Sequence, residues 1–233
     1  MRRETRHAAG VDLSVLVWDA VSPAHPPVVL LPGTGLTAEN WSEVAADLSR
    51  DRTVRAVDLR GHGGSDRPGT YSVELMTADV LALLASMGEE SDVVGHSLGG
   101  LVACRVAARS PLVRRLVLED VGLLRPRMPA APVRPDGDLA FDWAVVEQVR
   151  PEVDTPAADW PKVLAGIAAP VLAVGGGPTS FVPQEWVDDL VAVVPRATTV
   201  TIDVGHEVHA ARPREFLDAV RAFLDADEVD SAS

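Results

Sequence analysis

The chain has 233 residues, of which 47% are hydrophobic and 24% charged, a composition typical of a globular protein with one good-sized domain. With 21 Lys and Arg against 34 Asp and Glu, the formal net charge of −13 argues against a nucleic-acid partner, which needs a positive protein face. The single cysteine, Cys104, excludes an intramolecular disulfide and any multi-cysteine metal site. No apolar run approaches the roughly 18 residues of a membrane span, so we expect a cytoplasmic protein without a membrane partner.

Short runs rich in Val and Leu alternate with segments of helical period along the chain. This alternation is typical of an α/β fold, in which a mostly parallel central sheet is flanked by helices on both faces. The predicted strands are 13–18, 28–31, 53–57, 92–94, 115–119, 171–174 and 198–202. The predicted helices are 38–50, 72–87, 98–109, 184–194 and 214–225.

Residues 122–169 interrupt this alternation and separate two predicted strands. Their opening part, 124–132, is rich in proline, which excludes a regular helix or a central strand there. Short helices are predicted at 142–149 and 160–167. Because long connections in compact domains are commonly lids or binding loops, we predict a single domain over 1–233 with a short cap-like insertion at 122–169. Residues 226–233 are predicted to form a disordered tail.

A G-x-S-x-G pattern occupies residues 95–99, directly between a predicted strand and a predicted helix. Gly95 and Gly99 allow the chain to turn sharply, so that the Ser97 hydroxyl is exposed at the carboxyl edge of the sheet and at a helix N-terminus. A strand, a turn and a helix in this order form a nucleophile elbow. We therefore predict that Ser97 is a catalytic nucleophile.

A serine hydroxyl is a poor nucleophile unless a base lies within hydrogen-bond distance. His206 follows Gly205 on the loop between the last predicted strand and the last predicted helix, which projects it over the same edge of the sheet. We predict that His206 is the general base. The remaining histidines with no predicted role, interpreted as surface or core residues, are His7, His25 and His209.

Acyl transfer also requires hydrogen-bond donors for the developing oxyanion. The strand at 28–31 leads into the glycine-rich turn 32–35, where the Thr34 N–H can point at the site beside the N–H of Leu98. Together with Ser97, these two backbone groups form the predicted oxyanion hole.

The glycine-rich turn, the nucleophile elbow and the histidine loop, in this order, resemble the α/β-hydrolase superfamily, and the resemblance covers about residues 13–224. Trp41 after the oxyanion turn and the glycine-rich stretch 58–65 after the next strand are further matches. The resemblance implies an α/β-hydrolase fold and a small serine hydrolase with a short cap. The family usually has His-Gly where this chain has Pro32-Gly33, so the backbone donor remains but a side chain that braces the loop is missing.

In this family an acidic residue usually orients the histidine and completes a catalytic triad with the serine. The position of this acid departs more strongly from the family pattern. The family commonly places it after the late strand, in a pattern that ends G-x-x-D, where this chain has Thr179. Some members instead supply the acid from the end of the strand that neighbours the nucleophile strand, which here ends in Glu119 and Asp120. Asp120 is the predicted acid because it is the last residue before the chain leaves the strand and can reach His206. Glu119 is the alternative because adjacent strand residues point to opposite faces, and a Ser–His dyad is a third possibility.

The resemblance implies that the insertion largely sets substrate choice. Apolar and aromatic side chains near the predicted site make a candidate pocket. The predicted pocket residues are Trp41, His96, Leu123, Leu124, Phe141, Trp143 and Phe181.

The expected function is hydrolysis of a carboxylic ester or lactone through an acyl-enzyme on Ser97. A thioesterase, perhydrolase or C–C bond hydrolase would use the same Ser97 and His206. An alternative from another class is a non-catalytic receptor or interaction protein of this fold that binds a small apolar ligand, motivated by Thr179 and Pro32. No metal or organic cofactor is expected, the substrate is a small molecule, and the chain is expected to be a monomer or homodimer.

Overall fold

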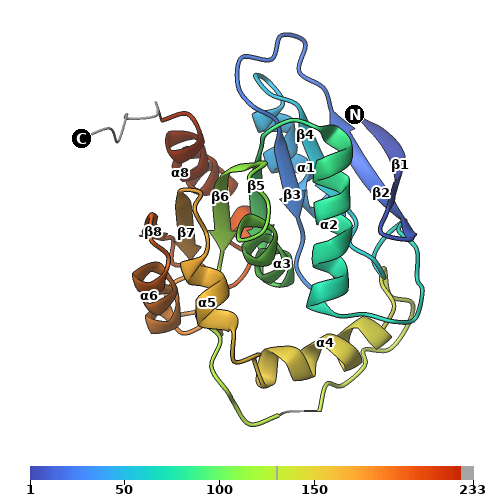
Figure 1. Cartoon of the computed structure of the whole chain (residues 1–233), viewed down its shortest axis with the longest axis vertical. Helices are drawn as coiled ribbons and strands as arrows, with labels where there is room; N and C mark the ends of the chain where they lie inside the picture. The colour runs from blue at the N-terminus through green and yellow to red at the C-terminus, as the bar shows by residue number, and fades with distance from the viewer. Residues whose placement is uncertain (130, 227–233) are drawn as a thin grey trace.

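One eight-stranded sheet with helices on both faces forms the centre of the protein in the computed structural model, which describes residues 1–129 and 131–226 (Figure 1). The strand order is β1-β2-β4-β3-β5-β6-β7-β8. β1 and β2 pair antiparallel, β2 and β4 pair antiparallel, and all other neighbouring strands are parallel. The predicted α/β fold with a mostly parallel sheet is therefore confirmed.

The predicted strands and the predicted main helices are all present, and their ends agree within two residues. The helix predicted at 38–50 is divided into a 3₁₀ turn and an α-helix. The strands are β1 (Arg2–Ala8), β2 (Val11–Trp18), β3 (Val28–Leu31), β4 (Val54–Val57), β5 (Ser91–His96), β6 (Val113–Glu119), β7 (Val171–Gly175) and β8 (Ala197–Thr201). The helices are η1 (Ala38–Trp41), α1 (Ser42–Leu48), α2 (Val73–Met87), α3 (Leu98–Ala107), α4 (Ala144–Asp154), α5 (Trp160–Ala165), α6 (Gln184–Val193), α7 (Val208–Ala211) and α8 (Pro213–Leu224).

The sequence pattern did not predict β1. This strand carries Arg2, Arg3, Glu4 and Arg6, so no apolar alternation marks it. It lies at the edge of the sheet, where its strand partner is β2, and the side chains of its three arginines are more than 40% exposed, as is common on edge strands. The prediction failed because an edge strand needs little apolar surface.

Two apolar cores cover the two faces of the sheet. α2, α3, α4 and α5 pack on one face, around residues such as Leu118. η1, α1 and α8 pack on the other face, around residues such as Trp41 and Val117. Because successive strand residues point to opposite faces, neighbouring residues at the end of β6 face different cores. This alternation decides where the two acids that end β6 can reach.

The insertion at 122–169 contains α4 and α5, and no helix or strand is assigned in the described part of 124–132. Figure 1 shows α4 (yellow) crossing beyond the ends of α2 and α3. The predicted end of the first short helix at residue 149 is wrong, because α4 continues past Pro151 to Asp154. A proline removes one helical N–H donor, but buried Val149 and the ion pair between Arg150 and Asp154 hold the last turn in place.

Two further predictions concern the C-terminal tail and the absence of a membrane-spanning segment. Of the predicted tail, residues 227–233 lie outside the described part of the chain. None of the helices in the described ranges has both the length and the apolar character needed to cross a bilayer.

Candidate active site

Ser97 lies at a sharp turn between β5 and α3. Its backbone is in the left-handed region, with a φ of 49°. The turn is possible because Gly95 and Gly99 pack without side chains: a Cβ on Gly99 would lie 2.3 Å from the carbonyl oxygen of Leu31. The N–H of Ser97 donates to the carbonyl of Glu119, 3.1 Å away, which joins the turn to the end of β6. The strained backbone of a non-glycine residue at a cavity is a common mark of a functional site.

Asp120 and His206 come together at the next position along the sheet edge. Asp120 also has a positive φ, of 50°, and its carboxylate is buried. The Nδ1–H of His206 donates to Oδ2 of Asp120 at 2.6 Å. The N–H of Gly176 donates to Oδ1 at 2.8 Å, and the hydroxyl of Ser180 donates to Oδ2. The carboxylate is therefore held by three donors, one of which is the predicted base.

Glu119, the alternative acid, lies on the opposite side of β6. Its buried carboxylate accepts hydrogen bonds from the N–H and the Nδ1–H of His209, at 2.8 and 2.9 Å from Oε1. The His209 ring stacks on Trp41, with 4.1 Å between ring centroids. Glu119 therefore belongs to the core beneath the sheet, and it is Asp120 that contacts His206.

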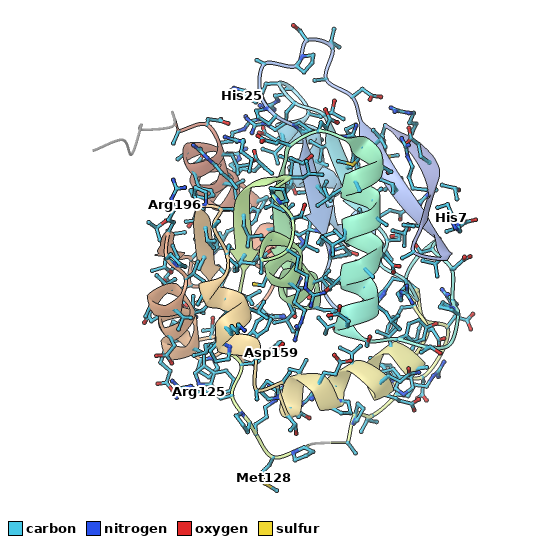
Figure 2. All side chains as sticks on the ribbon, viewed as in Figure 1. His7, His25, Arg125, Met128, Asp159 and Arg196 are labelled. Atoms are coloured by element: carbon cyan, nitrogen blue, oxygen red, sulfur yellow. The ribbon has the colours of Figure 1, made fainter. Side chains whose placement is uncertain are left out.

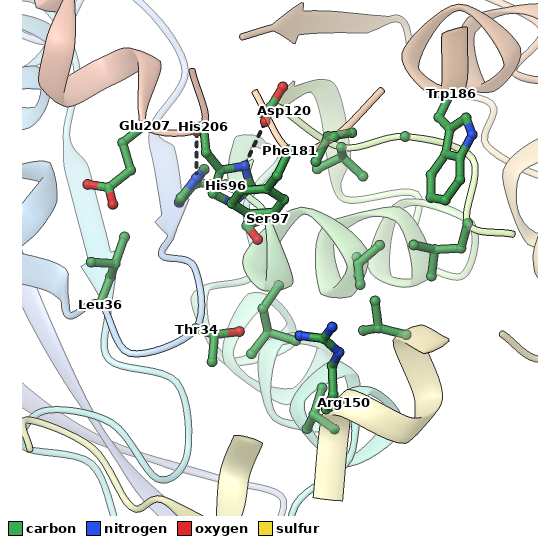
Figure 3. A pocket seen from close by; sticks show the side chains of 18 of the residues that line it. Thr34, Leu36, His96, Ser97, Asp120, Arg150, Phe181, Trp186, His206 and Glu207 are labelled. Carbon is green, nitrogen blue, oxygen red and sulfur yellow. Dashed lines mark hydrogen bonds and ion pairs between the residues drawn. The ribbon is translucent and has the colours of Figure 1, made fainter. Parts of the chain in front are cut away.

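Ser97 and His206 line one cavity of about 380 Å³ between the sheet edge and the insertion (Figure 3). Asp120, Thr34 and Leu98 line the same cavity. The structure thus brings all five predicted catalytic and oxyanion residues to one place. Of the predicted pocket residues, those that line this cavity are His96, Leu124 and Phe181.

The other predicted pocket residues do not line it. Trp41 is fully buried under the sheet, where it packs against His209 and Phe216. Phe141 stacks on His62 and closes over Gly35 from outside the cavity. The remaining two, which pack elsewhere on the insertion, are Leu123 and Trp143. These four assignments are corrected because apolar or aromatic character alone does not reveal whether a side chain faces the cavity or the packed interior.

His62 and Asp58 hold the predicted oxyanion turn and the start of η1, which follows it. The N–H of Gly35 donates to Nε2 of His62 at 3.1 Å, while Nδ1–H of His62 donates to the carbonyl of Arg60. Oδ1 of Asp58 accepts from the N–H of Ala38 at 2.7 Å. Burial lowers the pKa of His62, which keeps Nε2 free to accept. The glycine-rich stretch 58–65 therefore acts on the turn that contains Thr34.

His96 fills the space between the two carboxylate–histidine pairs. Its Nε2–H donates to the carbonyl of His206 at 3.0 Å, so it positions the backbone of the predicted base. Its ring centroid lies 4.6 Å from that of His206 and 5.5 Å from that of His209. Burial lowers the pKa of His96, which favours the neutral ring at this place.

Sequence reasoning missed several residues of the site. Gly176 and Ser180 lie on either side of Thr179, which stands where the family commonly has the acid, and their polar groups bind Asp120. Both residues are apparent in the sequence, but no local pattern indicates the carboxylate to which their N–H and hydroxyl groups donate hydrogen bonds. The cavity-lining residues that sequence reasoning did not single out include Leu36, Val146, Val149, Arg150, Trp186 and Glu207. Within the described ranges, no group of three or more His, Cys, Asp or Glu side chains is arranged to hold a metal ion.

Comparison with known proteins shows the family of this chain. A sequence profile of the alpha/beta hydrolase fold matches residues 26–150, which is more than half of the chain. The chain belongs to the alpha/beta hydrolase family. An sn-1-specific diacylglycerol lipase from Xenopus laevis is 27% identical to this alpha/beta hydrolase, over 96% of this chain and 87% of the lipase. The esterase YbfF from Escherichia coli K12 is 27% identical over 85% of this chain and 92% of the esterase.

Solved structures of other proteins share the fold of this alpha/beta hydrolase. The crystal structure of an N-formylmaleamic acid deformylase from Pseudomonas putida S16 has a TM-score of 0.81 at 21% identity, and covers 94% of this chain and 99% of its own. At this level of identity the likeness concerns the fold.

Proposed function

We propose that this alpha/beta hydrolase is a serine hydrolase of carboxylic esters, cyclic esters included. One observation carries the proposal: Ser97, on a left-handed turn, shares a cavity with His206, whose Nδ1–H is bonded to the buried carboxylate of Asp120. The names of the lipase and the esterase to which the chain is similar support ester substrates. Nucleophile, base and acid in this order are what acyl transfer requires.

In the proposed mechanism, His206 takes the proton of the Ser97 hydroxyl while Oγ bonds to the acyl carbon of the ester. The N–H groups of Thr34 and Leu98 donate to the oxyanion that forms. The carbon–oxygen bond to the alcohol then breaks, and the alcohol leaves with the proton from His206. A water molecule, deprotonated by His206, then bonds to the acyl carbon; the bond from this carbon to Oγ breaks, Oγ takes the proton from His206, and the acyl group leaves as a carboxylic acid. Asp120 keeps the ring oriented and stabilises its positive charge throughout.

Labelling of the intact protein with a fluorophosphonate tests the proposed nucleophile without a known substrate. We expect one adduct per chain in the wild type, measured by mass spectrometry, and none in Ser97→Ala. Ser110→Ala is the matched control, because Ser110 follows α3 and does not line the cavity, and it should label like the wild type. No adduct on a folded wild-type protein would contradict the enzyme proposal and favour the non-catalytic receptor.

Hydrolysis of p-nitrophenyl hexanoate and of δ-valerolactone then tests the bond that is cleaved. We expect turnover of at least one of them by wild type and not by Ser97→Ala. Turnover of thioesters alone, with neither oxygen ester accepted, would move the assignment to a thioesterase.

A further inference from the structure

Two arginines of the insertion line the cavity that also contains Ser97. Arg127 lies on the proline-rich segment and Arg150 lies on α4. Both bind the same acid: the Nε–H of each donates to the carboxylate of Asp154, with Arg150 2.9 Å from both oxygens. The side chain of Asp154 is only 2% exposed. The backbone N–H of Arg127 also donates to the carbonyl of Asp154, at 3.0 Å, so this arrangement is held by main chain as well as side chains.

The shared carboxylate leaves the outer ends of both guanidinium groups available. Within the described ranges, the side-chain hydrogen bonds of Arg127 and Arg150 are made by Nε, and none engages an Nη atom. Two permanent positive charges meet one negative charge, so this end of the cavity has an excess of one positive charge in a chain whose formal net charge is −13. Figure 3 shows Arg150 extending from α4 toward the middle of the pocket, into which the Ser97 hydroxyl also points.

The cavity that holds both arginines and Ser97 is also lined by apolar side chains. They include Leu98, Leu101, Val146 and Val149. The other titratable groups that line the cavity lie at the end that holds Ser97, and they are His96, Asp120, His206 and Glu207. A ligand that fills the cavity would therefore present a reacting group to Ser97, an anion to the arginines and apolar atoms to the rest of the lining.

We infer that the substrate is an ester that carries a carboxylate, and that the Nη atoms of Arg150, with Arg127 beside it, bind this carboxylate. The planar fork of a guanidinium group matches the two oxygens of a carboxylate, and its Nε–H bond to Asp154 fixes the orientation of the fork before substrate binds. The inference rests on the proposed function, because it assumes that an ester reacts at Ser97.

Matched pairs of esters that differ only in charge test the inference. Mono-p-nitrophenyl adipate and p-nitrophenyl hexanoate have the same acyl chain length, with a carboxylate or a methyl group at its end. The salt of 6-acetoxyhexanoic acid and hexyl acetate make the same comparison on the alcohol side. In at least one pair we expect wild type to have a kcat/KM roughly 10- to 100-fold higher for the anionic ester, the effect of a charge-assisted hydrogen bond.

Arg150→Gln is expected to reduce this ratio of anionic to neutral kcat/KM by roughly 10- to 100-fold, and Arg127→Gln to reduce it by a smaller factor. Arg125→Gln is the matched control. Arg125 carries the same charge on the same segment, but it lies on the outside of the molecule and pairs with Asp189, so its ratio should equal that of wild type (Figure 2). A wild-type ratio near one in both pairs would overturn the inference. Equal loss on both members of a pair in Arg150→Gln would show a structural role only.

A binding measurement separates failure of the inference from failure of the proposed function. N-methyladipamate and N-methylhexanamide, which are the unreactive amides of the first pair, are tested for their ability to slow fluorophosphonate labelling of Ser97. We expect the anionic amide to protect wild type at roughly 10-fold lower concentration, and this advantage to disappear in Arg150→Gln. Normal labelling with equal protection by both amides, together with a wild-type ratio near one for the alcohol-side pair, overturns the inference alone, whereas absence of labelling overturns the proposed function and the inference together.

Discussion

Two carboxylate–histidine pairs lie side by side at the end of β6, and they differ in what surrounds them. Asp120 bonds His206 at the edge of the cavity, and the side chain of His206 is 17% exposed. Glu119 bonds His209 in the core beneath the sheet, and the side chain of His209 is 2% exposed. The acids are neighbours in sequence, and the histidines are three residues apart.

This difference shows that a carboxylate and a histidine can form either a pair at a cavity or a contact within the core, depending on their surroundings. Strand alternation sends Glu119 toward Trp41, while the positive φ of Asp120 turns its side chain over the sheet edge. Only the pair at the edge can meet a substrate and Ser97. We therefore expect the Asp120 pair to control turnover and the Glu119 pair to control stability.

The largest expected effect is on turnover. Asp120→Asn should lower kcat by roughly 10⁴-fold, because the amide cannot stabilise the imidazolium form of His206 and favours the wrong tautomer. Glu119→Gln, the matched change on the neighbouring residue, should lower kcat by less than about 10-fold. The measurement is kcat on the best ester found, with circular dichroism to verify folding. A larger loss in Glu119→Gln than in Asp120→Asn would reverse the proposed roles.

The stability of the two histidine variants should follow the opposite order. His209→Ala should lower the free energy of unfolding by roughly 2–4 kcal/mol, because it removes a ring packed on Trp41 and leaves the buried Glu119 with fewer donors. His206→Ala should cost about 1 kcal/mol or less, since its side chain is partly exposed. Urea denaturation measures both values. Equal costs would mean that the two pairs are energetically alike.

His96 lies between the two pairs, and we expect it to make the free energy of unfolding depend on pH. Burial lowers its pKa in the folded protein below the ordinary value of 6.5, so the unfolded chain binds a proton at pH values where the folded chain does not. The free energy of unfolding should therefore fall as pH decreases below about 6.5, by up to about 1.4 kcal/mol per pH unit from this residue, until the folded pKa is reached. Urea denaturation of wild type and His96→Gln between pH 7.5 and 5 measures this contribution as the difference between their slopes. Identical slopes would exclude it.

The smallest expected effect is the change in kcat when one hydrogen bond to the Asp120 carboxylate is removed. Ser180→Ala removes one hydrogen bond to its carboxylate and should lower kcat by roughly 2- to 10-fold, since Gly176 and His206 still hold the group. Thr179→Ala is the matched control, because the Thr179 hydroxyl bonds Asp203 and should leave kcat as in wild type. An equal change in both variants would show that the loop responds as a whole and that the Ser180 bond has no particular role.

Much of the fold was predictable from the sequence, because local patterns report local structure. Alternating apolar runs and helical periods predicted the order of strands and helices, and G-x-S-x-G between a strand and a helix predicted the turn at Ser97. The charged edge strand β1 and the continuation of α4 past Pro151 were not predictable in this way. Both depend on pairing or packing with residues elsewhere in the chain.

The amino-acid sequence by itself determined the turn at Ser97 and a loop that could bring a histidine to the same edge of the sheet. Tertiary structure decided which of two adjacent acids meets His206, because that depends on strand register and on the positive φ of Asp120. It also decided that Arg127 and Arg150 share Asp154 and line the cavity, while Trp41 and Phe141 do not. These contacts join residues that are distant in sequence or lie on an irregular segment, and no local period encodes them.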